Sequence, residues 1–276
     1  MIFGRQIELK IESVSGASKT FLSGHENEND FHIDFTVEMG KSFTVKIYNV
    51  LRETFQLCEK KEKDSAKLQL YAGYKDGVKP SLLASGDIIT SQYKVSGVDR
   101  ILEMKGMPKV SEFYSQTEPT TYLNRNMSSI LEAILVKNSI KKYKINYFDS
   151  KIISQFVSSD NLKKDLDSIS KAEKLIHYFS RGILVIEPAE YKKQKLNEIV
   201  WLDRDSGLIQ SPTQEGANYK VKSLLNPELA VGEIVRISYR DNSNDKDIDS
   251  EFKILSGKHT ADLQNQFYTE FECMKL

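Results

Sequence analysis

Alternation of hydrophobic and polar residues dominates the first hundred positions of the chain. Apolar side chains recur at every second residue, which is the period of a strand with one buried and one exposed face. Six segments show this pattern, at residues 7–11, 31–37, 43–48, 66–74, 85–93 and 99–105. One short helical pattern interrupts them at residues 52–61. Many short strands joined by turns predict a compact barrel or sandwich.

The middle of the chain changes to a period of three to four residues, which is typical of helices. Residues 127–135 form one apolar stripe, with Asn126 or Ser128 as its candidate N-cap. A longer stripe over residues 162–179 predicts a second helix, which ends where the strand pattern 182–188 begins. This segment therefore predicts a small α/β domain.

The last third of the chain contains a hairpin pattern with strands at residues 221–225 and 234–239. Pro227 fixes its own φ and keeps Asn226 out of the helical region, so this corner is expected to hold the two strands in register. Gly232 is expected in a tight turn, and Gly73 is also assigned to a turn. The hairpin contains no catalytic side chain.

Composition and charge exclude several classes of protein. The chain has 276 residues, 39% hydrophobic and 28% charged, which suits a soluble globular protein of one large or two to three small domains. Its 39 Lys and Arg balance 39 Asp and Glu, so no overall field attracts nucleic acid or an anionic membrane. Because we find no apolar segment of signal or membrane-helix length, we expect folding in a cytosol. Cys58 and Cys273 are expected to be buried free thiols.

Candidate catalytic and metal-binding patterns have simpler interpretations. Ser168 and Lys171 have the spacing of some acyl-transfer enzymes, but the partner motifs of that class are missing, so a polar helix face is favoured. The chain has no HExxH zinc motif among its four scattered histidines, which are His25, His32, His177 and His259. We therefore predict no catalytic residue, no cofactor and no metal site.

An acidic segment near the C-terminus offers oxygen ligands at alternate positions. These residues are Asp241, Asp245, Asp247, Asp249 and Glu251. The segment has no Gly at the sixth position of a calcium loop and no Glu at the twelfth, so a solvated hairpin tip is favoured.

Short phrases along nearly the whole chain resemble those of phage tail baseplate hub proteins, and they occur in the same order. In the N-terminal part they are Ile47-Tyr48-Asn49-Val50, Leu70-Tyr71-Ala72-Gly73-Tyr74, Gly86-Asp87-Ile88 and Gly97-Val98-Asp99. In the C-terminal part they are Gly207-Leu208-Ile209, Pro212 and Leu224-Leu225-Asn226-Pro227-Glu228-Leu229 followed by Gly232.

The resemblance implies an α+β fold with two β-barrel tube domains that flank a small α/β domain. The tube domains would span residues 1–110 and 191–276, and the α/β domain residues 111–190. The two barrels are expected to be near-equivalent and separate, since one continuous sheet would argue against them.

The implied function is that of a non-enzymatic baseplate hub in a phage tail or a phage-tail-like particle. Three copies would form a homotrimeric ring that adapts the six-fold tail tube above to the three-fold spike below. DNA would be only a passing cargo, no membrane would be involved, and the protein would reside in the virion tail after synthesis in the bacterial cytoplasm. The channel is expected to be polar or acidic, and the acidic segment would face the channel or one end of the ring.

Two alternatives remain open from the sequence. One is a cell-wall-directed hydrolase or carbohydrate-binding module of the same particle, which a buried carboxylate pair in a cleft or an exposed aromatic platform would favour. The other is an unrelated cytosolic β-rich scaffold.

Overall fold

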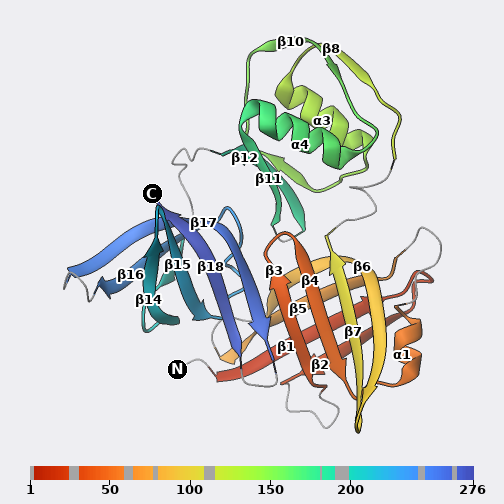
Figure 1. Ribbon diagram of the computed structural model, residues 1–276, viewed down its shortest axis with the longest axis vertical. Coiled ribbons are helices and arrows are strands. Elements are labelled where there is room, and N and C mark those ends of the chain that lie inside the picture. Colours follow the sequence, from red (N-terminus) through yellow and green to blue (C-terminus); the bar gives the residue numbers. More distant parts are fainter. Residues whose placement is uncertain are drawn as a thin grey trace. The chain divides into compact units, whose positions relative to one another are not determined.

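A computed structural model of the chain describes residues 3–24, 31–58, 65–76, 80–108, 116–180, 182–189, 199–241, 246–262 and 266–276. The chain divides into two compact units, one made of residues 1–108 and 196–276 and the other of residues 109–195 (Figure 1). Within the described ranges, no helix combines the length and the apolar character needed to cross a bilayer.

The N-terminal part of the first unit is an antiparallel sheet with one short helix. Its elements are β1 (Phe3–Glu12), β2 (Ser18–Ser23), β3 (Ile33–Glu38), β4 (Ser42–Tyr48), α1 (Arg52–Gln56), β5 (Lys67–Asp76), β6 (Ser81–Ser96) and β7 (Asp99–Met107). The strands lie in the order β3-β4-β7-β6-β5-β1-β2. The Phe31 N–H donates to the Leu22 carbonyl oxygen at 2.7 Å, which brings the two ends of this order together. Alternate side chains such as Leu9, Val45 and Leu70 are buried, as the sequence period predicts.

The C-terminal part of the same unit is also built from strands. They are β13 (Val200–Leu202), β14 (Leu208–Glu215), β15 (Asn218–Leu224), β16 (Ile234–Asp241), β17 (Lys246–Ala261) and β18 (Phe267–Lys275). Their order is β14-β15-β18-β17, with β16 beside β17 and β13 beside β16. Of the strand pairs between described residues in this part, the β13–β16 pair is parallel and the others are antiparallel. The strands predicted at residues 221–225 and 234–239 correspond to β15 and β16, but the predicted hairpin is wrong: β15 pairs with β14 and β18, whereas β16 pairs with β13 and β17. The corner at Asn226 and Pro227 therefore joins two strands that are not neighbours in the sheet and does not set a register between them.

One continuous 13-stranded sheet joins the two parts, because β17 pairs with β3. The ladder runs from the Lys258 and Glu38 pair to the Ala261 and Phe35 pair. The expectation of two separate sheets is therefore wrong. The sequence did not reveal this because both segments read as ordinary half-buried strands, whose period carries no information about a distant partner. Each part nevertheless has its own hydrophobic core.

The same five-strand order occurs in both parts, as β3-β4-β7-β6-β5 and as β14-β15-β18-β17-β16. Chain order matches too, because a short connection follows the second strand in each case, through α1 or through the corner after β15. Counted along the chain, the fourth strand of each set, β6 or β17, has 16 residues, and the fifth, β7 or β18, has nine. Both long hairpins shift register near the middle of the long strand, between Ile88 and Thr90 and between Ile254 and Ser256. We call these two sets the N-terminal repeat and the C-terminal repeat.

Among its described residues, the second unit has two helices and two small sheets. Its elements are β8 (Thr121–Asn126), α3 (Met127–Lys137), β9 (Tyr143–Ile145), β10 (Ile152–Val157), α4 (Leu162–Glu173), β11 (Leu175–Ser180) and β12 (Ile183–Pro188). One sheet is β10-β8 and the other β11-β12-β9. Asn126 is confirmed as the N-cap of α3, since its side-chain oxygen accepts the Ser129 N–H at 2.9 Å.

The prediction of one helix over residues 162–179 is wrong for its second part, where the structure has a strand. Helix α4 ends at Glu173, and Lys174 adopts the left-handed conformation with φ 53°. The following residues form strand β11, which pairs with β12 along its whole length. Apolar residues at Leu175 and Phe179 fit both periods, so the stripe alone could not locate the helix end.

Candidate assembly site at the junction of the two repeats

A hydrogen-bond chain fixes the corner after β15 against the sheet junction. Thr269 Oγ1 accepts the Asn226 N–H at 3.1 Å and lies 2.9 Å from His259 Nδ1. The Leu229 carbonyl accepts a hydrogen bond from the same imidazole. A neutral ring that donates to Leu229 has its other nitrogen free to accept, so the Thr269 hydroxyl donates to Nδ1. Each polar group at this corner is thereby satisfied away from water.

Burial of His259 keeps this imidazole neutral. Its exposed fraction is 3%, and desolvation lowers its pKa from 6.5 to about 3, against the opposite effect of the Leu229 carbonyl. His259 lies opposite Val37 in the β3–β17 ladder, so the network stands where the two repeats join. The arrangement holds a backbone corner in place and has no feature of a catalytic acid or base.

Of the residues predicted at the corner and in turns, Gly232 lies in a turn but Gly73 does not. Asn226 and Pro227 are buried at the corner, where Asn226 Oδ1 accepts the Glu228 N–H at 2.9 Å. Gly232 has φ 85° and its N–H donates to the Ile254 carbonyl, so the turn there is confirmed. Gly73 does not lie in a turn: it is inside β5, opposite Gln6 of β1. Its assignment as a turn residue is wrong because a strand continues through the glycine to Asp76.

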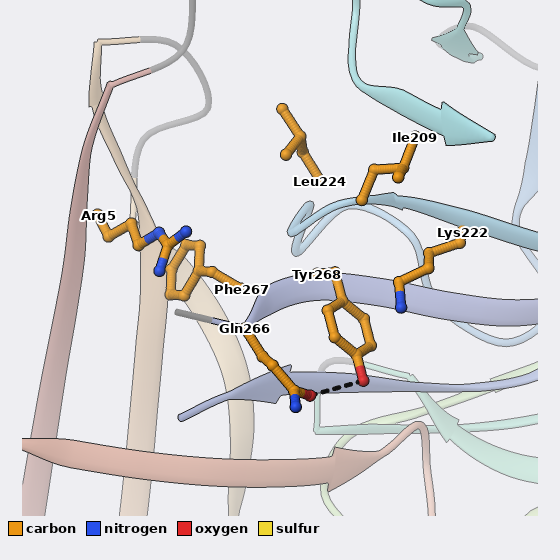
Figure 2. A pocket seen from close by; sticks show the side chains of 7 residues that line it. All are labelled: Arg5, Ile209, Lys222, Leu224, Gln266, Phe267 and Tyr268. Atoms are coloured by element: carbon orange, nitrogen blue, oxygen red, sulfur yellow. Dashed lines mark hydrogen bonds between the residues drawn. The ribbon is translucent and has the colours of Figure 1, made fainter. Parts of the chain in front are cut away.

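An open hollow of about 410 Å³ lies beside the junction (Figure 2). Its lining residues are Arg5, Ile209, Lys222, Leu224, Gln266, Phe267 and Tyr268. The Lys222 amine lies 3.7 Å from the centre of the Tyr268 ring and 3.0 Å from Glu270. Burial alone would raise the pKa of Glu270, but Lys258 and Lys222 outweigh it and lower the pKa below its usual value. Lys222 and Lys258 share the one Glu270 carboxylate, so the hollow is lined by ion-paired and aromatic side chains together.

The acidic segment is only partly an exposed loop. Asp245 lies outside the described residues, and Asp241 ends strand β16. Asp247, Asp249 and Glu251 belong to strand β17. They follow its pleat and do not gather into a metal site: within the described ranges no group of three His, Cys, Asp or Glu is placed to hold a metal ion.

On the surface of the C-terminal repeat, Asp249 forms an ion pair with Arg236, which in turn lies over Trp201. Its carboxylate accepts two hydrogen bonds from the Arg236 guanidinium, at 2.8 and 2.5 Å, which lower the pKa of Asp249 below its usual value. The same guanidinium lies over the Trp201 ring, 5.0 Å from its centre. Trp201 itself is 53% exposed. Its strand β13 has only three residues at an edge of the sheet, which leaves one face of the indole without a covering layer.

The other candidate residues behave as structural groups. Ser168 and Lys171 are exposed on α4, as expected for a polar helix face. His177 lies in β11; its Nδ1 is 2.9 Å from Ser170 Oγ, and burial lowers its pKa against the effect of Asp167. His25 lies outside the described residues, and His32 pairs with Asp34 at 2.7 Å.

The two cysteines are buried and free, as the sequence predicts. Burial raises the pKa of both Cys58 and Cys273 to about 12, which keeps the thiols protonated at neutral pH. They are therefore core residues without reactive character.

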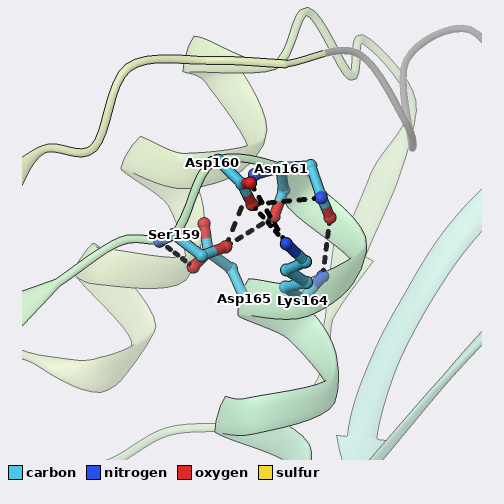
Figure 3. A network of polar contacts seen from close by, with 5 residues as sticks. All are labelled: Ser159, Asp160, Asn161, Lys164 and Asp165. Carbon is cyan, nitrogen blue, oxygen red and sulfur yellow. Dashed lines mark hydrogen bonds and ion pairs between the residues drawn. The ribbon is translucent and has the colours of Figure 1, made fainter.

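A polar network in the second unit caps the start of helix α4 (Figure 3). The Asn161 side-chain oxygen accepts the Lys164 N–H at 3.0 Å, and Lys164 forms an ion pair with Asp160 at 2.9 Å. The buried Asp165 carboxylate accepts the Ser159 N–H at 2.5 Å. These contacts satisfy the first turn of α4 and leave no arrangement for catalysis in this group.

Comparison with solved structures finds phage tail proteins of similar length. The tail protein from Neisseria meningitidis MC58 has a TM-score of 0.63 and 10% identity, with 99% of this chain and 97% of that chain covered. The 43 kDa tail protein of prophage MuSo2 from Shewanella oneidensis has a TM-score of 0.62 and 10% identity, with 98% of each chain covered.

A third similar structure comes from a secretion system. The E. coli protein c3393, a type VI secretion component with structural similarity to the T4 bacteriophage tail proteins gp27 and gp5, has a TM-score of 0.54 and 13% identity over 90% of this chain and 74% of that one. Neither protein-family models nor curated proteins give a match. The resemblance inferred from the sequence phrases is confirmed at the level of the fold.

Proposed function

We propose that this chain, which has the fold of phage tail proteins, is the structural hub of the baseplate in a phage tail or phage-tail-like particle. Three copies form a ring whose six repeats match a six-fold tail tube, while the ring as a whole presents three-fold symmetry to a spike. The observation that supports this most strongly is the identical five-strand order of the two repeats. Only a chain with two near-equivalent units lets three subunits imitate six.

The junction between the repeats supports the same proposal. A closed ring needs contacts that continue from one unit to the next without leaving exposed sheet edges. Within one chain, β3 and β17 already make such a contact through paired backbone. The function requires complementary surfaces and an open channel, so we propose no catalytic step. The partners are a tail tube or distal tail protein on one side and a spike protein on the other, and DNA passes through as cargo.

The location follows from the proposed assembly. The protein resides in the baseplate of the particle, and it is made in the host cytoplasm. The channel surface is polar or acidic, because each phosphate held by Lys or Arg would tighten binding and slow the passage of DNA. The acidic residues Asp247, Asp249 and Glu251 face the channel or one end of the ring.

Trp201 favours a second candidate function, a carbohydrate-binding module of the same particle. Its indole is 53% exposed, and an exposed aromatic face is what sugar rings stack on. Arg236 already lies over the ring, which limits the face available. Pull-down of the purified chain with insoluble peptidoglycan, compared with a Trp201→Ala variant, distinguishes the two. We expect equal and weak retention of both, whereas retention lost with the indole would favour the second candidate.

The mass of the assembled protein tests the proposed function. Light scattering on the purified chain, alone and with the cognate tube protein, is expected to give a species three times the 31.6 kDa of one chain. The tube protein is included because ring closure can require a template. A stable two-fold dimer that buries well over ~1,200 Å² would contradict the proposal.

A further inference from the structure

The tips of the two long hairpins have opposite environments, although they occupy equivalent places in the repeats. In the C-terminal repeat, Ala261 and Phe267 at the end of the β17–β18 hairpin are each 4% exposed and belong to the core of the N-terminal repeat. In the N-terminal repeat, Val95 and Val98 at the end of the β6–β7 hairpin are 69% and 94% exposed. The register of the two hairpins aligns Val95 with Ala261, so an apolar side chain that is buried in one repeat has an exposed apolar counterpart in the other.

The backbone edges show the same difference. Residues 258–261 of β17 pair with β18 on one side and with β3 on the other. Residues 92–95 of β6 pair with β7, and in the part of the chain that the structure describes no strand pairs with their other side. The N-terminal repeat therefore has an open edge where the C-terminal repeat has β3.

The strand equivalent to β3 is β14, and its second half is an edge as well. Each of these strands is bonded to its own part of the sheet before or within its first half: the Phe31 N–H, just before β3, donates to the Leu22 carbonyl of β2, and Ser211 Oγ in β14 donates to the Arg240 carbonyl of β16 at 3.4 Å. Residues 35–38 of β3 pair with β4 on one side and with β17 on the other. The end of β14, residues 213–215, is exposed and lies at the terminus of the strand order.

We propose that a second copy of this chain occupies these edges: residues 213–215 of β14 in one copy pair antiparallel with residues 92–94 of β6 in the next. The contact repeats between copies the β3–β17 ladder that each copy contains internally. This inference rests on the proposed ring and names the surfaces that close it. The β6–β7 tip then buries Val95 and Val98 against the C-terminal repeat of the neighbour, as Ala261 and Phe267 are buried within one chain.

The internal ladder fixes the register of the proposed one. The register shift of each long hairpin aligns Ser256 with Thr90, so Thr260 corresponds to Lys94. The β4 and β15 pairings align Glu38 with Glu215, and therefore Thr36 with Thr213. Because Thr260 lies opposite Thr36, Lys94 of one copy lies opposite Thr213 of the next.

The sequence of β14 limits the length of the ladder. Pro212 has no N–H to donate, and the strand is irregular between Gln210 and Thr213, so pairing begins after the proline. A ladder of this length is similar to the internal one, which has four residue pairs. The apolar Ile209, 47% exposed near the start of β14, adds contact area for the neighbour's hairpin tip.

Disulfide trapping tests the pairing directly. Residues opposite each other in an antiparallel ladder have Cα atoms about 4.5–5.5 Å apart, within the range that a disulfide spans. The double variant K94C/T213C is oxidised mildly and analysed without reductant, alone and as a mixture of the two single variants. Because both positions are exposed, the substitutions are expected to leave the fold intact. Because the native thiols are buried, they are not expected to form disulfides of their own. The matched control is K105C/T213C, because Lys105 is an exposed β7 residue away from the open edge of β6.

We expect the double variant to form a covalent trimer, and the two single variants to form a covalent dimer only when mixed. The control pair is expected to remain uncrosslinked. If light scattering shows trimers but the double variant does not crosslink, the proposed pairing is overturned and the proposed hub function stays intact. Equal crosslinking of the control, or no covalent product at any concentration, would also overturn the pairing, while the hub function is judged separately by assembly with the tube protein.

Discussion

His259 and Tyr93 occupy equivalent positions in the two repeats and bond to equivalent connections. Each lies three residues after the register shift of its long strand. The His259 ring bonds to the carbonyl of Leu229, in the connection between β15 and β16, and the Tyr93 hydroxyl donates to the carbonyl of Val50, in the connection between β4 and β5, at 3.2 Å. The repeats therefore share a way of fixing this connection as well as a strand order.

Acid should destabilise the protein through His259. Since the folded pKa of about 3 lies below the ordinary value of 6.5, the unfolded chain takes up the proton first. The contribution of this residue to stability is complete above pH 6.5 and is lost as the pH falls toward 3. At pH 5 the loss is about 2 kcal/mol, and denaturant titration between pH 8 and pH 5 measures it.

The control for this prediction is His259→Asn, which keeps hydrogen-bonding capacity without titrating in this range. The variant is expected to be less stable at pH 8 but to show a weaker dependence on pH below 6.5. An unchanged pH dependence would mean that other groups cause the acid sensitivity.

Removal of the Thr269 hydroxyl should weaken the corner. Thr269→Val keeps the shape but leaves the Asn226 N–H and His259 Nδ1 without a partner, and the expected loss of unfolding free energy is about 1–3 kcal/mol. Thr260→Val, at a half-buried position one strand over, is the matched control and should cost less. Equal losses in the two variants would show that the hydroxyl is not what stabilises the corner.

Gly232 should tolerate few replacements. Its φ of 85° lies in the left-handed region, where a β-branched residue is strained, so Gly232→Val should destabilise the protein by more than about 1 kcal/mol. Gly232→Asn should cost less, because asparagine adopts this conformation more readily. Thermal unfolding of both variants measures the difference, and equal melting temperatures would contradict the strain.

An exposed tip residue should affect assembly without affecting folding. Val98 is 94% exposed in one chain, so Val98→Asp should leave the melting temperature of the monomer unchanged. The same change should reduce the fraction of trimer, because a charge would be buried against the next copy. Sedimentation analysis measures that fraction, with Lys105→Asp as a control at an exposed site away from the tip.

Local pattern predicted many strands but not their partners. The alternation in residues 43–48 and 99–105 identified β4 and β7, because each strand has one buried face. The β3–β17 pairing was not predictable, since it joins residues more than two hundred positions apart and leaves no trace in either strand's period. The structure also contains β2, whose burial pattern begins with three exposed residues and therefore gives little alternation.

The candidate site was visible only in part. Asn226, Pro227 and Gly232 were recognisable because turn residues have specific backbone demands. His259 was not, since a histidine on an alternating strand reads as a polar surface residue until its partners Thr269 and Leu229 are placed. The exposure of Trp201 was not predictable, because it follows from the shortness of β13 at the edge of the sheet.

A three-dimensional reconstruction of the assembled protein by electron cryo-microscopy tests the central claim most directly. The claim is that two topologically matched repeats per chain let three copies imitate a six-fold tube. The reconstruction is expected to show three-fold symmetry with six similar β-domains around one open pore, and β14 of each copy beside β6 of the next. A two-fold particle, or a ring in which the two repeats lie at different distances from the axis, would contradict the claim.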